Sequence, residues 1–185
     1  MQSDLAAAVD ALRVGGVIAY PTEAVYGLGC DPLNGQACAR LFALKQRPPG
    51  QGVLLIAADF EQVASFVDFA ATPASVLARA QASWPGPHTW IFPRAAAVPA
   101  WIAGSHAGIA LRVTAHAPAA QLCRAFGGAL VSTSANRHGE PAALTAAAVL
   151  AAFGNDLAAI LNGALGGLER PTPIRDAISG EVVRY

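Results

Sequence analysis

The sequence predicts a single α/β domain over residues 1–185, in which helices flank a twisted sheet of mostly mixed or antiparallel strands. Two observations carry this prediction. Short apolar runs alternate along the chain with segments that have helix start and stop signals, which is typical of a layered α/β architecture. The chain is also long enough for one hydrophobic core, and neither a repeat nor a linker-like stretch divides it.

Capping and turn residues define the predicted helices. Ser3 and Asn34 are residue types that cap helix N-termini, and Gly15-Gly16 would end the first helix. Pro118 favours a first helical turn. The predicted helices cover residues 4–13, 34–44, 118–126 and 144–153, and two more begin at Asp59 and at Thr72-Pro73.

Strands are predicted where short apolar runs are bounded by turn residues. They cover residues 17–20, 53–57, 89–92, 109–113, 129–133, 159–161, 172–174 and 182–184. Residues 21–31, which are punctuated by glycines, are expected to form a loop after the first strand. Antiparallel pairings are expected in the second half of the chain, so the sheet is predicted to be mixed.

The composition excludes several classes of protein. Hydrophobic residues make up 54% of the chain and charged residues 13%, which is typical of a folded protein rather than a disordered one. The formal net charge is zero, so the basic excess of a phosphate-gripping nucleic-acid binder is missing. The three cysteines lie far apart without a C-x-x-C pair, which fits free thiols in a reducing cytoplasm. Neither a signal peptide nor a bilayer-spanning run is found, so a cytoplasmic protein without a membrane partner is expected.

Motifs of the common nucleotide-binding and hydrolytic sites are absent from the sequence. The pattern G-x-x-x-x-G-K-[ST] does not occur, and Gly27-Leu28-Gly29 lacks the third glycine of a dinucleotide fingerprint. No G-x-S-x-G elbow occurs. The histidines have no metal-ligand spacing, so no metal site built from protein side chains is predicted. Nucleotide chemistry in this chain therefore needs an unusual site.

Polar clusters stand at the ends of the apolar strands instead. They are residues 20–29, residues 45–48, Arg112, residues 132–136 and residues 171–176. Ligands of open α/β sheets bind in the crevice outside strand ends, so these clusters are candidate ligand contacts.

The side chains in these clusters suit anionic ligands. Lys45 and Arg47 offer two cations to anionic oxygens, and Arg112 can bind a carboxylate through two parallel hydrogen bonds. Neutral donors and acceptors come from three residues that alternation would point to one side of a continuing strand: Ser132, Ser134 and Asn136.

Each cluster also has a purely structural interpretation. Lys45 and Arg47 can form a solvated helix end, where cations favour the helix dipole. Serine and threonine at a strand terminus usually cap a turn or a helix. Arg112 can belong to a structural ion pair, and Glu23 can pair with a nearby arginine. The functional interpretation therefore depends on all clusters occurring together and in order.

Taken together, these motifs resemble the YrdC-like family of threonylcarbamoyl-AMP synthases. The matching segments are residues 20–31, residues 45–48, residues 84–87 with Thr89, Arg112-Val113, residues 132–136 with Gly139, and Pro171-Thr172. They span nearly the whole chain, and the length resembles the short bacterial form of the family. After residue 48, the run of residues 51–56 stands where some relatives have Asn-Pro-Leu and then a histidine, and Pro173 and Arg175 also depart from some relatives.

This resemblance implies a twisted sheet around a deep, positively charged cavity that binds ATP and L-threonine, with bicarbonate as the carbon source. The family's catalytic and ATP-binding signature falls on Lys45, Arg47, Ser134 and Asn136. Its threonine contacts fall on Thr22, Arg112, Ser132 and Thr172. Mg²⁺ is expected on the triphosphate, held mainly by phosphate and water because carboxylates are few.

The implied reaction needs no covalent enzyme intermediate. The threonine amine captures carbon dioxide or bicarbonate, and the carbamate oxygen attacks the α-phosphorus of ATP, so that pyrophosphate leaves. The labile product implies hand-off to downstream tRNA threonylcarbamoyl transferase proteins, and weak RNA binding is a further expectation.

Two alternatives stay open from the sequence. The first is a double-stranded RNA or ribosome-binding module without catalysis, which the zero net charge disfavours. The second is a carbamoyl transferase domain like those of hydrogenase-maturation proteins. The chain lacks the zinc-finger-like cysteines expected beside such a domain.

Overall fold

Ten strands form a mixed sheet in the computed structural model, which describes residues 2–170 and 172–184. The strands are β1 (Gln2–Ser3), β2 (Ile18–Pro21), β3 (Tyr26–Gly29), β4 (Leu54–Ala57), β5 (Thr89–Pro93), β6 (Gly108–Val113), β7 (Leu130–Ser134), β8 (Ala159–Leu161), β9 (Ile174–Asp176) and β10 (Val182–Arg184). Their order across the sheet is β1-β8-β2-β3-β7-β4-β6-β5-β9-β10. Neighbours run antiparallel from β2 through β3 and β7 to β4, whereas β4 pairs with β6 in parallel. The predicted α/β class with a mixed sheet is confirmed.

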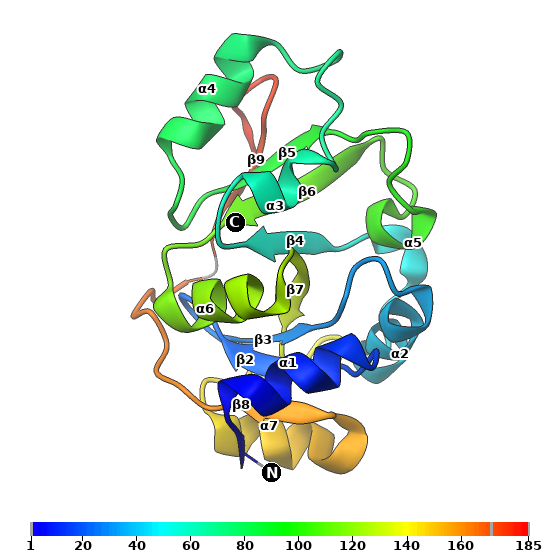
Figure 1. The fold of residues 1–185 in the computed structure, drawn as a ribbon, viewed down its shortest axis with the longest axis vertical. Coiled ribbons are helices and arrows are strands. Elements are labelled where there is room, and N and C mark those ends of the chain that lie inside the picture. Colours follow the sequence, from blue (N-terminus) through cyan, green and yellow to red (C-terminus); the bar gives the residue numbers. More distant parts are fainter. Residues whose placement is uncertain (1, 171, 185) are drawn as a thin grey trace.

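Helices cover both faces and the ends of this sheet (Figure 1). They are α1 (Leu5–Arg13), α2 (Gly35–Lys45), α3 (Glu61–Ala64), α4 (Ala74–Ala82), α5 (Ala100–Ala103), α6 (Ala117–Phe126) and α7 (Ala146–Phe153), with 3₁₀ turns η1 (Pro49–Gln51) and η2 (Gly154–Asp156). α1 and α6 pack side by side against β2, while α7 packs against β8. None of the helices in the described part of the chain has the length and apolar character needed to cross a membrane.

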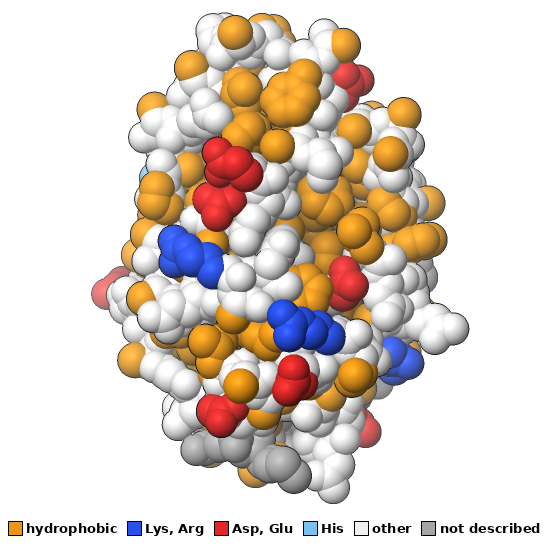
Figure 2. Space-filling view, in the orientation of Figure 1, with side chains coloured by type: hydrophobic (Ala, Val, Ile, Leu, Met, Phe, Trp, Pro, Cys, Tyr) orange, Lys and Arg blue, Asp and Glu red, His pale blue; other side chains and the backbone are white. Residues whose placement is uncertain are grey.

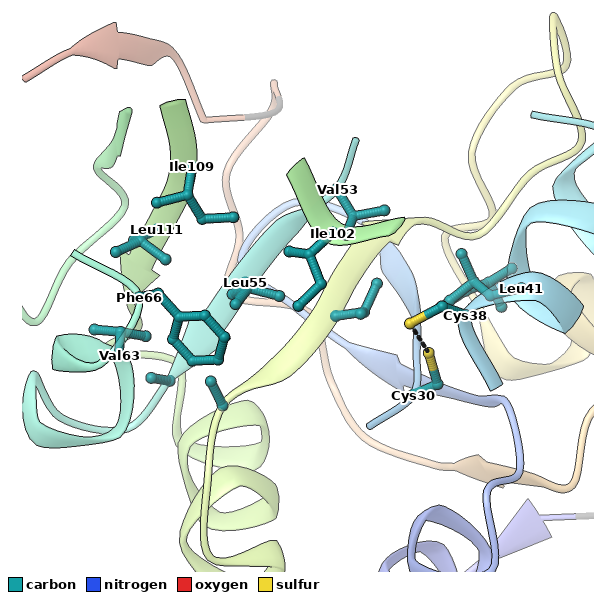
Figure 3. Packing of buried hydrophobic residues seen from close by; sticks show 14 of the residues in the cluster. Cys30, Cys38, Leu41, Val53, Leu55, Val63, Phe66, Ile102, Ile109 and Leu111 are labelled. Carbon is teal, nitrogen blue, oxygen red and sulfur yellow. Dashed lines mark hydrogen bonds between the residues drawn. The ribbon is translucent and has the colours of Figure 1, made fainter. Parts of the chain in front are cut away.

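Two hydrophobic clusters, one on each face, hold the layers together. Successive strand residues point to opposite faces, so Leu55 belongs to the larger cluster and Ile56 to the smaller one beneath α1 and α6. Figure 3 shows part of the larger cluster, where Leu55 packs between Phe66 and Ile102. Cys30 and Cys38 meet in this cluster with their Sγ atoms 3.8 Å apart, and all three cysteines are free and buried.

The predicted helix boundaries hold to within two residues. Asn34 caps α2, as predicted, by accepting hydrogen bonds from two backbone N–H groups of the first turn. The prediction for α1 was one residue off, because Asp4 rather than Ser3 is the cap and accepts from the N–H of Ala7 at 2.8 Å. Thr145 caps α7, which therefore begins later than predicted. α5 has four residues and was not predicted.

The loop predicted for residues 21–31 is wrong, because residues 26–29 form β3. β3 pairs with β2 and β7, and its glycines mark close packing instead of a turn. A Cβ atom at Gly29 would lie 2.6 Å from the carbonyl oxygen of Val131 and 2.7 Å from the ring of Tyr20. A second shift concerns β9, which lies at residues 174–176 rather than at the predicted 172–174.

Gly29→Ala is expected to destabilise the protein by about 1–3 kcal/mol, because the added methyl group meets a backbone oxygen and a buried ring that have no room to move. Urea unfolding followed by circular dichroism measures this. Gly128→Ala is the matched control, since its Cβ would come no closer than 3.9 Å to the neighbours found around it. Equal unfolding midpoints for the two variants would contradict the close packing of β3.

Candidate active site

Six of the eight predicted site residues line one cavity of about 550 Å³. They are Thr22, Arg47, Arg112, Ser132, Ser134 and Thr172. These residues come from the turn after β2, the segment after α2, β6, β7 and the segment before β9, so the fold brings together positions that are far apart in the chain. Pro171, which belongs to the same predicted cluster, lies outside the described residues. A cavity is thus present, while its depth and net charge stay predictions.

Lys45 and Asn136 are the two predicted residues that are not among those lining the cavity. The Lys45 side chain is 5% exposed. Its Nζ donates to the carbonyl oxygens of Ser134 at 2.5 Å and Asn136 at 2.9 Å, and lies 3.3 Å from Asn136 Oδ1. Lys45 therefore holds the end of β7 in place through these backbone carbonyl oxygens. Direct contact of Lys45 with a substrate stays a prediction.

The backbone explains why Lys45 and Arg47 point to different places. Lys45 ends α2, and Gln46 then adopts a left-handed conformation with φ 52° that terminates the helix. After this reversal Arg47 reaches the cavity, where its Nη2 donates to the carbonyl oxygen of Gly52 at 2.7 Å. The backbone of Gln51 and Gly52 thus helps to hold the Arg47 guanidinium group.

Asn136 organises the turn that follows β7. Its Oδ1 accepts from Ser134 Oγ at 2.5 Å, and its Nδ2 donates to the carbonyl oxygens of Arg137 at 2.9 Å and Glu140 at 2.7 Å. β7 ends at Ser134, so the alternation expected to run through Asn136 stops two residues before it. Asn136 orients the Ser134 hydroxyl, which is the member of this pair that lines the cavity.

Arg112 stands at the wall of the cavity with partners on two sides. Its Nη1 donates to Thr172 Oγ1 at 2.7 Å, and its Nη2 lies 3.5 Å from Glu23 Oε2. The Arg112 and Glu23 side chains are 8% and 9% exposed. The ion pair weighed above as a structural alternative for Arg112 is confirmed, and it lies within the cavity wall.

Thr114 is a residue of this site that the sequence reasoning missed. Its buried hydroxyl donates to Glu23 Oε1 at 2.5 Å and accepts from the N–H of His116 at 3.0 Å. The signal was present in the sequence, because Thr114 is a polar residue just past the end of the strand that carries Arg112, where ligand contacts are expected. Thr22, by contrast, donates its hydroxyl to the carbonyl oxygen of Val25 at 2.7 Å and so closes the turn that presents Glu23.

Three ionisable side chains near the cavity have shifted pKa values. Burial, aided by the charge of Arg47, lowers the pKa of Lys45 to about 8. Burial also raises the pKa of Tyr20 above its ordinary range, and the Tyr20 hydroxyl donates to the carbonyl oxygen of Val131 at 3.3 Å. Tyr20 is therefore a structural residue under the cavity. Burial lowers the pKa of His116, which is half-buried beside Glu23.

Metal ligands are scarce around this cavity. Among residues 2–170 and 172–184, no group of three histidine, cysteine, aspartate or glutamate side chains is placed to hold a metal ion. Glu23 is the one carboxylate among the described residues lining the cavity, and Arg112 and Thr114 already engage it.

Known proteins are similar to this chain in sequence and in fold. The family model Sua5_yciO_yrdC, described as "Telomere recombination", matches residues 10–185. The chain is 56% identical over 173 residues to the threonylcarbamoyl-AMP synthase of Halorhodospira halophila, in a match that covers 94% of this chain and 90% of that protein.

Two solved structures extend the comparison. Sua5 of P. abyssi, complexed with L-threonine, matches with a TM-score of 0.86 at 30% identity, covering 93% of this chain and 50% of that chain, so this chain spans half of that protein. YciO of E. coli matches with a TM-score of 0.80 at 28% identity, covering 97% of this chain and 87% of that chain. With its motifs, its fold and nearly its whole length shared in this way, the chain belongs to the Sua5/YciO/YrdC family.

Proposed function

We propose that the chain is a threonylcarbamoyl-AMP synthase, which converts L-threonine, bicarbonate and ATP into threonylcarbamoyl-AMP and pyrophosphate for the threonylcarbamoyladenosine modification of tRNA. The observation that carries this proposal is the convergence of Arg112, Thr172 and Ser132 with Arg47 and Ser134 in one cavity. The relatives named above, one of them complexed with L-threonine, support it.

The threonine end of the cavity is formed by Arg112 and three hydroxyl residues. Arg112 holds the threonine carboxylate, for which a guanidinium group offers two parallel donors. Thr172 already accepts a hydrogen bond from Arg112 and orients its guanidinium group. Ser132 and Thr22 line the same wall and orient the amino acid.

The nucleotide end is formed by Arg47 and Ser134. Both line the cavity, and a hydrogen bond holds each of them, from Arg47 to the carbonyl oxygen of Gly52 and from Ser134 to Asn136. A cation and a hydroxyl fixed in this way are suited to phosphate oxygens. The buried ammonium group of Lys45 adds its charge through the Ser134 backbone, to whose carbonyl oxygen it donates.

Catalysis in this arrangement consists of positioning and charge neutralisation. The neutral threonine amine adds to carbon dioxide with loss of one proton, or to bicarbonate with loss of one water molecule, to give a carbamate. One carbamate oxygen then attacks the α-phosphorus of ATP, the bond to the β-phosphate oxygen breaks, and pyrophosphate leaves. Arg47 neutralises charge on the phosphates, while Arg112 fixes the amino acid so that its carbamate faces the phosphorus.

Mg²⁺ fits this site as a companion of the nucleotide. The one carboxylate among the described cavity residues, Glu23, is engaged by Arg112 and Thr114, so phosphate oxygens and water are the ligands that remain. When bound, Mg²⁺ would neutralise charge on the triphosphate.

The proposal predicts that pyrophosphate release requires three substrates at once. Release is measured with ATP and Mg²⁺, with threonine or serine, and with or without bicarbonate. We expect release with threonine and bicarbonate, loss to background when either is omitted, and weaker release with serine because it lacks the methyl group, which is worth about 1–3 kcal/mol in an apolar pocket. Threonine-independent release would refute the proposal.

The same assay separates the RNA-binding alternative. An RNA-binding module without catalysis would bind RNA in a salt-sensitive way and would show no threonine-dependent release of pyrophosphate. Figure 2 shows basic side chains on one face interspersed with acidic and apolar ones, an arrangement that lends no support to a strong phosphate-gripping surface there. Hand-off to downstream tRNA threonylcarbamoyl transferase proteins in the cytoplasm completes the proposed role.

A further inference from the structure

The carbonyl oxygens that receive the Arg47 guanidinium group belong to a segment outside the strands. Arg47 Nη2 donates to the carbonyl oxygens of Gly52 at 2.7 Å and Gln51 at 3.4 Å. Gln51 ends the 3₁₀ turn η1, and β4 begins only at Leu54. A connecting segment keeps its position only where other parts of the chain hold it, so the place of the guanidinium group depends on what packs against residues 50–52.

The turn between α5 and β6 holds this segment by hydrogen bonds. The N–H and the hydroxyl group of Ser105 both donate to the carbonyl oxygen of Gly50, each at 3.1 Å. At the other end of the segment, the N–H of Val53 donates to the carbonyl oxygen of Ile102 at 2.8 Å. Three hydrogen bonds thus bracket the two carbonyl groups that receive the guanidinium group.

Gly104 brings the two backbones into direct contact. It has φ 62°, in the left-handed region that favours glycine. A Cβ atom at this position would collide with the carbonyl oxygen of Gly50 and lie 2.5 Å from the backbone nitrogen of Gly52. Gly52 is the reciprocal case, with φ 60° and a Cβ position 2.7 Å from the carbonyl oxygen of Ala103. Neither backbone has room for a side chain here, so a shift of one displaces the other.

This contact lies at the cavity of the proposed active site. Ala103 and His106, which flank the turn, line that cavity together with Arg47 and Gly52. The turn itself lies outside all the segments that carry the family resemblance. Its contribution to the site is therefore made through the backbone that it packs against.

We propose that Gly104 and Ser105 are positioning residues of the reaction, which fix the carbonyl oxygen of Gly52 and through it place the Arg47 guanidinium group for the phosphates of ATP. The inference rests on the proposed function, in which Arg47 faces the nucleotide. Arginine has several rotatable bonds, so without a fixed acceptor its guanidinium group spreads over other positions. Arg112 at the threonine end has its own partners, so the effect of the turn falls on ATP and not on threonine.

The test measures both substrates in Ser105→Ala and Gly104→Ala. Pyrophosphate release is followed with ATP and threonine varied in turn, and a non-hydrolysable ATP analogue with Mg²⁺ is titrated calorimetrically. Ser105→Ala removes one hydrogen bond at an exposed position, so the KM for ATP and the Kd of the analogue should rise about three-fold. Gly104→Ala forces the backbones apart, and we expect a rise of at least about ten-fold. The KM for threonine should keep its wild-type value in both.

Two controls separate positioning from a general loss of stability. Ser105→Thr keeps the hydroxyl group and should restore the affinity that Ser105→Ala loses. Gly16→Ala creates a comparable clash, because its Cβ would lie 2.6 Å from the Ala158 side chain, and Gly16 is not among the residues that line the cavity. It should lower the unfolding midpoint in urea and leave both KM values unchanged.

Two results would overturn the inference. The first is unchanged affinity for the ATP analogue in either variant, and Ser105→Ala supplies this test even where Gly104→Ala fails to fold. The second is an equal rise of the two KM values, which would mean that the turn only stabilises the fold as a whole. Wild-type protein that binds the analogue but releases no pyrophosphate with threonine would instead bring down the proposed function.

Discussion

Arg112→Ala is expected to raise the KM for threonine in pyrophosphate release by at least about thirty-fold, which corresponds to about 2–5 kcal/mol of binding free energy. The guanidinium group is buried at the cavity wall and donates to Thr172, so its removal takes away the cation that the threonine carboxylate needs. The KM for ATP should change far less, because the proposed nucleotide end of the cavity lies at Arg47 and Ser134. Steady-state kinetics with each substrate varied in turn separates the two effects.

A complication of this variant is the charge that it leaves behind. Without Arg112, the Glu23 carboxylate loses its partner at 3.5 Å, and an unpaired buried charge costs about 3–5 kcal/mol of folding free energy. The double variant Arg112→Ala/Glu23→Gln removes that charge, so we expect it to recover folding stability without recovering threonine affinity. Arg124→Ala, on the exposed face of α6, is the matched control. A wild-type KM for threonine in a folded Arg112→Ala protein would contradict the assigned role.

Lys45→Met is expected to lower both the unfolding midpoint in urea and the rate of pyrophosphate release. Methionine replaces the aliphatic stem but leaves the carbonyl oxygen of Asn136 without its donor, at about 1–3 kcal/mol, while the carbonyl oxygen of Ser134 loses one of its two donors and keeps the N–H of Asn136. The turn that presents the Ser134 hydroxyl then loses its anchor. Since small displacements of positioning groups cost large factors in rate, we expect kcat to fall by about ten- to a hundred-fold.

The pH dependence gives Lys45→Met a second readout. Burial lowers the pKa of Lys45 from 10.5 to about 8, so between these values the unfolded chain binds more protons at this residue than the folded one does. Stability contributed by Lys45 should therefore be constant below pH 8 and should increase as the pH rises from 8 towards 10.5. The difference in unfolding free energy between wild type and Lys45→Met should widen over that window.

Lys45 is the one lysine in the sequence, which makes its titration directly observable. A protein labelled with ¹³C-lysine gives a single side-chain resonance that needs no assignment. We expect its midpoint near pH 8, and the neutral side chain above that pH should coincide with falling activity. A midpoint near 10.5 would show that the side chain is solvated, and it would contradict the assignment of Lys45 as a buried residue that holds the end of β7.

Most strands and helices followed from local sequence patterns, but β1, α5 and the glycine-rich segment after β2 did not. Gly27 and Gly29 are typical of a loop by composition, yet Gly29 packs under Tyr20 and against the backbone of Val131 inside the sheet. That requirement arises from a contact more than a hundred residues away in the chain, so no local pattern expresses it. The β7 turn was misjudged for a similar reason, because the hydrogen bonds of Asn136 end the alternation.

Six of the eight predicted site residues line the cavity, but their arrangement could not be predicted from the sequence. Arg112 and Thr172 were identified as site residues by chemistry and family motif, and they are in hydrogen-bond contact. The sequence could not say that Lys45 and Arg47 would point to different places, because the left-handed conformation of Gln46 separates them. Glu23 was recognised only as a candidate ion-pair partner, and its place in the cavity wall emerges only in three dimensions.

The central claim is that one cavity holds the amino acid and the nucleotide together. A crystal structure of the protein with L-threonine and a non-hydrolysable ATP analogue tests it most directly. We expect threonine against Arg112 and the phosphates against Arg47 and Ser134, within contact distance of each other. A second cavity of about 630 Å³ lies elsewhere and is lined by Arg40 and Arg137. Phosphates bound in that cavity, with threonine alone at Arg112, would contradict the account.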